Sequence, residues 1–183
     1  MKSDAPLRPN HRGESPSVAV SALVDPTAVV IGNVRIGEEV FVGPGAVIRA
    51  DEPGSRVVIG DRSNVQDRAV IHALEGSEVI VGGGTSLAHA CIVHGPCRIG
   101  SGCFIGFGSV VFNAVLGDGV VVKHLAVIEG VKIGAGRLVP SGSTIDSSER
   151  VEKLELADEE AERFAKKVVL ANALLLKGYK EMG

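Results

Sequence analysis

The chain has 183 residues, a net charge of −3 and 45% hydrophobic residues, but only 3% aromatic ones. This length suits one substantial domain, and a slightly acidic chain lacks the basic footprint of a nucleic-acid-binding protein. No apolar run approaches the roughly 18 residues of a membrane span, so we expect neither nucleic acid nor a membrane as partner.

Residues 1–20 form a polar beginning. The stretch MKSDAPLRPNHRGESPSV lacks the apolar middle of a secretory signal. We interpret residues 1–20 as a polar N-terminal arm, mobile or draped on the domain, and we expect a cytoplasmic protein.

Residues 21–146 carry a six-residue repeat, interrupted by two segments that we interpret as loops, DEPGSR (51–56) and ALEGSE (73–78). Six is a multiple of the period of a strand but not of a helix. One unit buries so little that units must stack, which predicts an all-β solenoid of about six coils. Its interior is predicted from the recurring aliphatic residues Val24, Val30, Ile36, Val42, Ile48, Ile59, Val65, Ile71, Val81, Leu87, Val93, Ile99, Ile105, Val111, Leu116, Val122, Ile128, Ile133 and Val139.

Residues 147–183 change character and predict a helical segment packed on the solenoid or on a neighbour. Asp158 can cap a helix, because acidic residues follow it near the positive end of the helix dipole. The helix is predicted to pack through one apolar stripe, made of Phe164, Val168, Ala171, Leu175 and Tyr179.

Three histidines take defined places once the units are counted. His72 and His94 each follow an inward aliphatic residue, so they occupy the same outward position on adjacent coils, one strand spacing apart. His89 lies on another side and can join them only across a three-fold interface. Three imidazoles with an open position are a common catalytic zinc arrangement, whereas a single outward histidine is usually just solvated.

Other polar residues share these columns. The count places Arg49 under His72, and Gln66 and Asp67 on the side that carries His89. These columns are more polar than we expect for a side of the solenoid that contacts only its own core. They fit a buried interface between subunits. We interpret the two other histidines, His11 and His124, as ordinary surface residues.

Cys91, Cys97 and Cys103 are spaced six apart, at a small-residue position of the repeat. We interpret them as interior packing residues rather than as a second metal site, which suits a reducing compartment.

The segments VIRADE, IGDRSNVQDRAVIHALE, SLAHACIVHGPCRIG, FIG and GYKE resemble γ-class carbonic anhydrases, from about residue 20 to the C-terminus. The resemblance implies a left-handed parallel β-helix of hexapeptide repeats plus a C-terminal α-helix. It also implies a homotrimer with Zn2+, or Fe2+ or Co2+, at each subunit interface, and reversible hydration of CO2 to bicarbonate by metal-bound hydroxide. His72 and His94 of one chain and His89 of the next would be the ligands.

The resemblance also implies roles for residues around the metal. Arg49 would form an inter-subunit ion pair with Asp67, and Asp51 would be a nearby structural acid. Gln66 would orient the hydroxide, and Asn172 would lie near the active site.

Two acidic residues match family positions proposed to pass protons, Glu52 and Glu75. The family archetype has a long acidic loop after HALE, whereas only GSE precedes the next strand here. Both acids could instead be ordinary solvated loop residues.

Two alternatives stay open. One is a metal-binding trimer with little activity that serves as a scaffold or complex subunit. The other is a hexapeptide acyltransferase using an acyl-CoA donor, with one histidine as general base. That class needs only one catalytic histidine, so the convergent set argues against it, while Glu52, Gln66 and Asn172 favour hydration.

Overall fold

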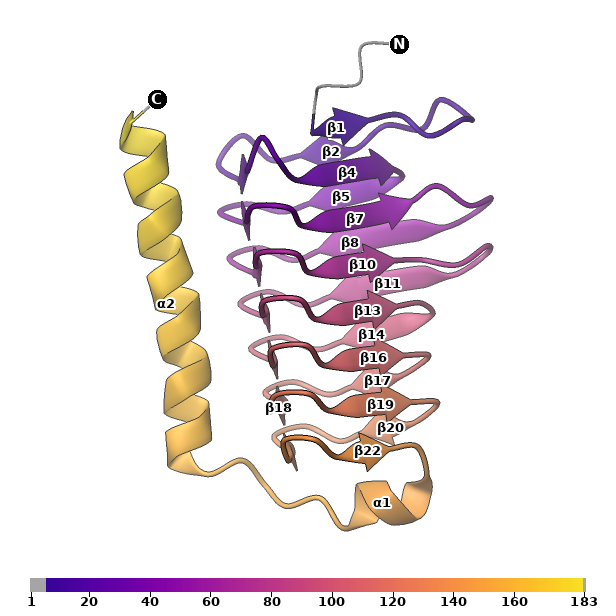
Figure 1. Ribbon diagram of the computed structural model, residues 1–183, viewed down its shortest axis with the longest axis vertical. Coiled ribbons are helices and arrows are strands. Elements are labelled where there is room, and N and C mark those ends of the chain that lie inside the picture. Colours follow the sequence, from indigo (N-terminus) through magenta and orange to yellow (C-terminus); the bar gives the residue numbers. More distant parts are fainter. Residues whose placement is uncertain (1–5, 183) are drawn as a thin grey trace.

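The computed structural model describes residues 6–182 as a three-sided prism of stacked coils with a long helix alongside (Figure 1). Within residues 6–182, twenty-two short strands form three parallel sheets, which we call A, B and C. Sheet A contains β1 (Leu7–Arg8), β4 (Val29–Gly32), β7 (Val47–Ala50), β10 (Val70–His72), β13 (Ile92–His94), β16 (Val110–Phe112), β19 (Val127–Glu129) and β22 (Thr144–Ile145). Sheet B contains β2 (Ser17–Val18), β5 (Val34–Ile36), β8 (Arg56–Ile59), β11 (Glu78–Val81), β14 (Cys97–Ile99), β17 (Val115–Leu116) and β20 (Lys132–Ile133). Sheet C contains β3 (Leu23–Val24), β6 (Phe41–Val42), β9 (Asn64–Val65), β12 (Ser86–Leu87), β15 (Phe104–Ile105), β18 (Val121–Val122) and β21 (Leu138–Val139).

The coils wind in a left-handed sense. The strands of sheet A run from left to right across the front of Figure 1, the chain then passes behind into sheet B, and the coils descend from the N-terminus. The predicted left-handed parallel β-helix is therefore confirmed. Sheets B and C have seven strands each, so the solenoid has about seven coils rather than the six predicted.

The recurring aliphatic residues point inward, as predicted. Ile48, Ile71 and Val93 pair in register on three successive coils and are fully buried. The core is therefore one continuous aliphatic column. Each such side chain contributes roughly 1.5–3 kcal/mol to the stability of the fold by leaving water.

The three cysteines lie in this core and are free thiols. Burial raises the pKa of Cys91 to about 12 and that of Cys103 to about 11. Raised pKa values favour the thiol over the thiolate that binds metals, and the place of all three cysteines in the core agrees with their interpretation as packing residues.

The solenoid begins earlier than residue 21. Strands β1 and β2 lie within the predicted arm and pair with β4 and β5. Without them, the first complete coil would leave main-chain groups of its strands unpaired. The arm of residues 1–20 is thus corrected for residues 7–18, and residues 1–5 lie outside the described residues.

Two helices follow the last coil. α1 (Ser148–Glu152) and α2 (Glu159–Met182) fall within the predicted helical segment. The main-chain N–H of Ala161 donates to Oδ1 of Asp158 at 2.7 Å, which confirms the predicted cap. α2 runs back along sheet C, where it contacts β6, β12 and β18. Neither helix combines the length and the apolar character needed to cross a membrane.

The buried stripe of α2 is rotated from the predicted one. Ala161, Ala165, Asn172 and Leu176 face the sheet. Of the predicted stripe only Val168 is partly buried; Phe164, Ala171, Leu175 and Tyr179 are exposed. The reason is that Phe104 and Phe41 already fill the outer face of sheet C, so the helix approaches through alanines. The rings of Phe164 and Tyr179 pack against those phenylalanines instead.

Leu87 tests the core directly. Its side chain is fully buried in the middle of the solenoid, so Leu87→Ala should lower the free energy of unfolding by about 2–5 kcal/mol. Leu156→Ala makes the same change at a side chain that is 67% exposed, and it should cost less than about 1 kcal/mol. Urea unfolding at one fixed protein concentration measures both, and equal losses would contradict this assignment of the core.

Candidate metal centre and its surroundings

Two imidazoles lie side by side at the edge of sheet A that is formed by the carboxyl-terminal ends of its strands. His72 ends β10, His94 ends β13, and the parallel register pairs them directly, as the repeat count predicted. Nδ1 of His72 is 3.1 Å from Nε2 of His94. The other two ring nitrogens are buried and have no hydrogen-bond partner among the described residues. Because buried polar atoms almost always have partners, the two nitrogens without hydrogen bonds indicate that the surroundings of these rings are incomplete in one chain.

Charged side chains surround His72. Arg49 lies in register beneath it and donates two hydrogen bonds to Oδ2 of Asp51, at 3.1 and 2.9 Å. The other carboxylate oxygen of Asp51 is 3.5 Å from Nε2 of His72, and Oε1 of Glu52 is 3.4 Å from the same nitrogen. The predicted column of Arg49, His72 and His94 is thus confirmed, with both acids beside it.

These contacts set the protonation of the cluster. Burial opposes ionisation of Asp51, but the hydrogen bonds and charge of Arg49 outweigh it and lower the pKa of this carboxyl group. Burial, and then the positive charge of Arg49, lower the pKa of His72. A lowered pKa favours the neutral imidazole near pH 7, which is the form that binds metals.

The pair fits a zinc ion in its dimensions. Two nitrogens bound tetrahedrally to zinc, each at about 2.0–2.1 Å, lie about 3.3 Å apart. The observed separation of 3.1 Å between ring nitrogens of His72 and His94, which is also the length of a hydrogen bond between the two rings, is close to this value. The two imidazoles are therefore spaced as two ligands of one tetrahedral zinc ion would be.

The third predicted ligand lies elsewhere on the chain. His89 lies in the turn between β12 and β13, where sheet C passes into sheet A, whereas His94 is the last residue of β13. Nδ1 of His89 is 3.4 Å from Oδ2 of Asp67, and both side chains are about half exposed. Residues 6–182 contain no cluster of three His, Cys, Asp or Glu side chains able to hold a metal. One chain therefore carries a pair of imidazoles at the carboxyl-terminal ends of the strands of sheet A. The third imidazole lies at the opposite edge, where the chain enters the strands.

The predicted ion pair between Arg49 and Asp67 does not form within the chain. Arg49 bonds Asp51, and Asp67 lies beside His89. The two side chains belong to opposite edges of sheet A, just as the histidines do. Within one chain, Arg49 and Asp67 therefore have different partners.

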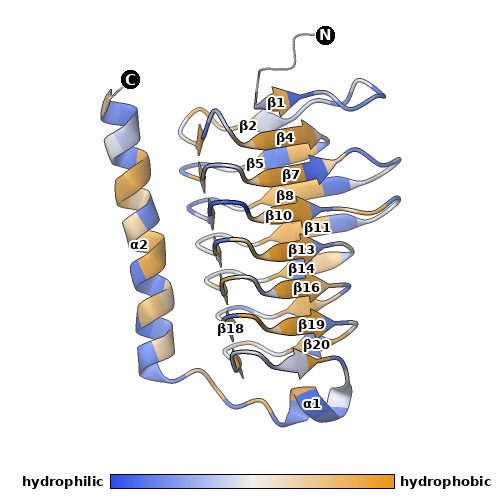
Figure 2. Cartoon of the chain, in the orientation of Figure 1, coloured by the Kyte–Doolittle hydropathy of each residue, from blue (hydrophilic) through white to orange (hydrophobic). Residues whose placement is uncertain are grey.

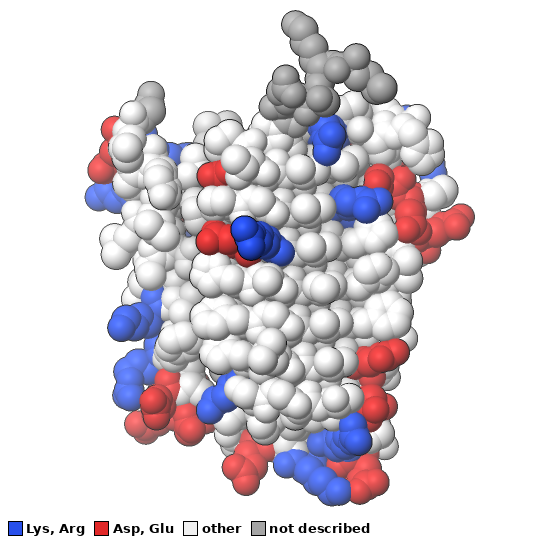
Figure 3. Space-filling model, viewed as in Figure 1, with Lys and Arg blue, Asp and Glu red and all other residues white. Residues whose placement is uncertain are grey.

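The outer face of sheet A carries a continuous aliphatic row beside the column of Arg49, His72 and His94. One aliphatic side chain from each of six strands points outward in register. These side chains are Val29, Val47, Val70, Ile92, Val110 and Val127, half-buried except Ile92, which is 39% exposed. The strands are correspondingly hydrophobic in Figure 2, and most of the middle of this face carries no charged side chain in Figure 3. A row of aliphatic side chains on the outer face of a parallel sheet is typical of a face that another element or chain covers.

Gln66 belongs to a buried polar chain on the outer side of sheet C. Its Nε2 donates to Oδ1 of Asn64 at 2.9 Å, and Nδ2 of Asn64 donates to Oγ of Ser86 at 2.8 Å. All three side chains are almost completely buried. Asn64 and Ser86 were not among the predicted site residues, although Asn64 stands two positions before Gln66 and therefore points to the same face.

Asn172 lies on the buried side of α2 and donates to the carbonyl of Val168 at 2.9 Å. Phe164 contacts Phe104 of β15, and Tyr179 stacks on Phe41 of β6. Asn172 stands midway between these two anchors, so it lies over the intervening strands β9 and β12, which carry Asn64 and Ser86.

The two predicted proton carriers differ in their surroundings. Glu52 is partly buried with its carboxylate beside His72. Glu75 is exposed, and its main-chain N–H donates to Oε2 of Glu52 at 2.7 Å. Among the described residues, no hydrogen bond or ion pair links the carboxylate of Glu75 to the other predicted site residues.

His124 shares the column of His89, with the ring of Phe107 between them. That ring stacks on His124 at 4.3 Å and tilts against His89 at 5.4 Å. Nδ1 of His124 accepts a hydrogen bond from the main-chain N–H of Phe107. These contacts give His124 a local packing role.

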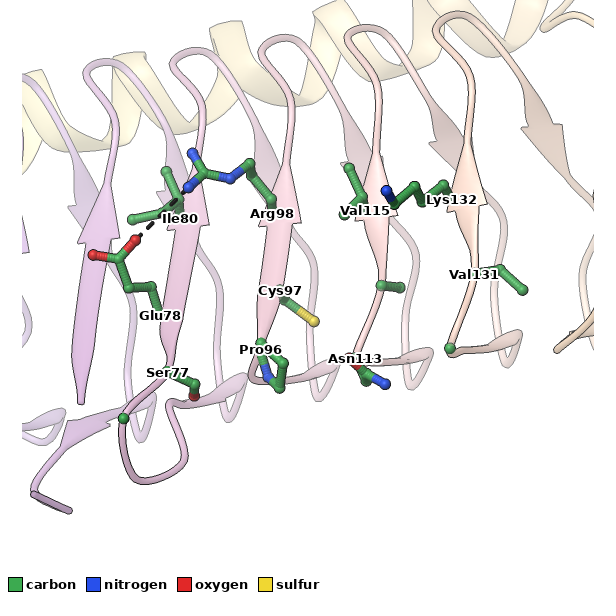
Figure 4. Close-up of a pocket in the computed structure, with 13 residues that line it drawn as sticks. Ser77, Glu78, Ile80, Pro96, Cys97, Arg98, Asn113, Val115, Val131 and Lys132 are labelled. Atoms are coloured by element: carbon green, nitrogen blue, oxygen red, sulfur yellow. Dashed lines mark ion pairs between the residues drawn. The ribbon is translucent and has the colours of Figure 1, made fainter. Parts of the chain in front are cut away.

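A surface groove of about 560 Å³ lies elsewhere, over sheet B (Figure 4). Its wall includes Ile80, Val115, Lys132 and the ion pair of Arg98 with Glu78, whose charged atoms are 3.7 Å apart. None of the predicted site residues lines it, so the chemistry proposed for the histidines does not involve this groove.

Comparisons with known proteins agree with the six-residue repeat and with the family that the sequence resembles. Residues 21–50 match the family described as bacterial transferase hexapeptide (six repeats). The chain is 39% identical to a carbonic anhydrase of Methanosarcina thermophila, over 96% of this chain and 80% of that protein. It is 40% identical to the carboxysome assembly protein CcmM of a Nostoc species, over 87% of this chain but only 30% of that protein. A crystal structure of a hexapeptide transferase family protein from Anaplasma phagocytophilum superposes with a TM-score of 0.81 at 27% identity, covering 96% of this chain and 98% of that one.

Ser86 tests the buried polar chain. Ser86→Ala removes the acceptor of the Asn64 amide, and an unpaired buried donor should lower the free energy of unfolding by about 1–3 kcal/mol. Ser141→Ala makes the same change at an exposed position and should cost less than about 0.5 kcal/mol. Urea unfolding compares the two, and equal stability of both variants would contradict the hydrogen bond.

Proposed function

The chain belongs to the γ-class carbonic anhydrase family of hexapeptide-repeat proteins, and from this membership we propose that it is a metal-dependent enzyme for the reversible hydration of CO2. The working form is a homotrimer with one metal ion at each subunit interface. His72 and His94 of one chain and His89 of its neighbour are the ligands, and the ion is Zn2+, with Fe2+ or Co2+ as alternatives.

The paired ring nitrogens of His72 and His94 are the observation that carries this proposal. They lie 3.1 Å apart, and each ring has a second, buried nitrogen that makes no hydrogen bond among the described residues. Two imidazoles fill only half of a tetrahedral site, and His89 stands at the opposite edge of the same sheet. A three-fold ring is a head-to-tail arrangement that brings opposite edges of neighbouring chains together.

The outer face of sheet A supports the trimer. Its aliphatic row from Val29 to Val127 is continuous with the histidine edge, so covering this row by neighbouring chains buries apolar surface beside the ligands. Arg49 and Asp67, at opposite edges of the sheet, would pair across the same contact.

Zinc held by three imidazoles acidifies a bound water to a pKa of about 7 and so supplies a nucleophile for CO2 at neutral pH. The chain supplies the surroundings of this reaction. Asn64 holds the amide of Gln66 in place, which leaves the carbonyl oxygen of Gln66 to orient the reacting oxygen. Asn172 is proposed to lie near the same site, and Asp51 fixes Arg49.

Hydration also releases one proton, which must leave the site. Glu52 has one carboxylate oxygen 3.4 Å from His72 and is only partly buried. We assign it the transfer of that proton to buffer. The three buried free thiols suit a reducing, cytoplasmic location.

A scaffold function is the second candidate. The chain matches about a third of the length of carboxysome assembly proteins at 40% identity, so a metal-binding trimer of this fold could serve as a subunit of a larger complex. The acyltransferase alternative is weaker, because that chemistry gives no reason for paired imidazoles.

His89 tests the shared metal site. His89→Ala should lose at least about nine tenths of the bound zinc, because two remaining imidazoles bind far more weakly, while the trimer persists. His124→Ala, in the same column, should keep full zinc content. Metal analysis and light scattering measure these outcomes, and full occupancy in His89→Ala would contradict the ligand assignment.

Mixed trimers show whether the ligands come from two chains. His72→Ala and His89→Ala should each lack zinc alone, but in every mixed trimer one site combines intact residues of both chains. Random co-assembly should therefore restore about one quarter of the parental zinc. No restoration in verified mixed trimers would contradict a site shared between subunits.

CO2 hydration by anaerobically purified protein, with metal analysis of the same sample, tests the activity. The rate should scale with metal content. Glu52→Ala should lower turnover by at least about tenfold in weak buffer, and concentrated imidazole should restore it. A fully loaded trimer without hydration would favour the scaffold function, and turnover independent of buffer would remove Glu52 from proton transfer.

A further inference from the structure

The carboxylate of Glu52 is held from two sides. Oε1 is 3.4 Å from Nε2 of His72, and Oε2 accepts the main-chain N–H of Glu75 at 2.7 Å. A hydrogen bond to an ionised carboxylate is about twice as strong as a neutral one. The neighbouring coil thus fixes the orientation of Glu52 through a main-chain group, while the side chain of Glu75 is exposed.

Two stacked turns place that N–H. The turn Glu52–Ser55 has Ser55 N–H donating to the carbonyl of Glu52 at 3.1 Å, and the turn 74–77 has Ser77 N–H donating to Leu74 at 3.0 Å. The third residue of each is a glycine with positive φ, +67° for Gly54 and +63° for Gly76, which identifies type II turns. The N–H of Gly76 donates to the carbonyl of Pro53 at 2.8 Å, so the turns are joined.

The second position of these turns is filled differently. Proline occupies it in the first turn and Glu75 occupies it in the second. Proline is favoured at this position of type II turns, so the geometry does not require an N–H there. In the second turn, however, the N–H is used, because it is the donor to Glu52.

We propose that Glu75 acts through its main chain: its N–H holds the Glu52 carboxylate against His72, and its own carboxylate carries no proton in the reaction. Glu75 is then a positioning residue. This inference deepens the proposed function and, for its effect on turnover, rests on it.

Amide hydrogen exchange tests the hydrogen bond without any activity measurement. In metal-free trimer, Glu52→Ala should speed exchange of the Glu75 N–H by about tenfold or more. The N–H of Gly76, bonded to a main-chain carbonyl, should change by less than about twofold. An unchanged rate at Glu75 would overturn the proposal.

Two substitutions then separate main chain from side chain. Glu75→Ala removes the carboxylate and keeps the N–H, whereas Glu75→Pro removes both. Proline suits this position of the turn, since Pro53 occupies it in the turn Glu52–Ser55. CO2 hydration in weak buffer should be at least about fivefold slower for Glu75→Pro than for Glu75→Ala, and imidazole should close the gap. Zinc content and trimer size should match between the two variants.

The possible outcomes are distinct. Equal loss in both variants would show that the carboxylate itself acts, and no loss in either would show that positioning is irrelevant; both overturn the proposal. If the zinc-loaded parental protein hydrates no CO2, the proposed function fails. The hydrogen-exchange experiment alone then decides whether the N–H of Glu75 holds Glu52. A misfolded Glu75→Pro trimer leaves that same decision to exchange.

Discussion

Each coil of the solenoid is hydrogen-bonded in parallel register to the coil above and the coil below. This register forces equivalent residues into columns about one strand spacing apart, so one choice of residue repeats its consequence up the prism. Inside, it stacks Ile48, Ile71 and Val93 into the core. Outside, it stacks Arg49, His72 and His94 at one edge. The candidate metal centre is therefore a property of the register, because a shift by one residue would turn these side chains to the other face.

The three sides of the prism have different surroundings. α2 covers sheet C and encloses a second, small apolar cluster that includes Ala88, Phe104 and Ala161. Sheet B presents charged side chains such as Arg98 and Lys132. Sheet A is apolar outside with histidines at both edges, which is the pattern expected of a side that faces other copies. The proposed site thus depends on assembly for chemistry and for burial alike.

Main-chain and amide groups position the polar side chains around the candidate site. Gln66 is held by Asn64, which is held by Ser86, and Glu52 is held by the N–H of Glu75. Such bonds fix a side chain in one orientation without adding charge near the histidines. The rigid stacking of coils makes this possible, since donors on one coil lie at fixed distances from acceptors on the next.

Sequence alone determined the parts of this protein that depend on period. The six-residue repeat identified the solenoid and its inward residues, and counting units paired His72 with His94 and placed His89 on another side. Only the tertiary structure decided what depends on contacts between elements that no period relates. It began the solenoid with β1 and β2, because an end coil needs partners for its main chain. It rotated the buried face of α2, because Phe41 and Phe104 already fill the surface beneath. It also brought the N–H of Glu75 to Glu52, because a hydrogen bond between two turns depends on how their backbones stack, and residue types do not encode that directly.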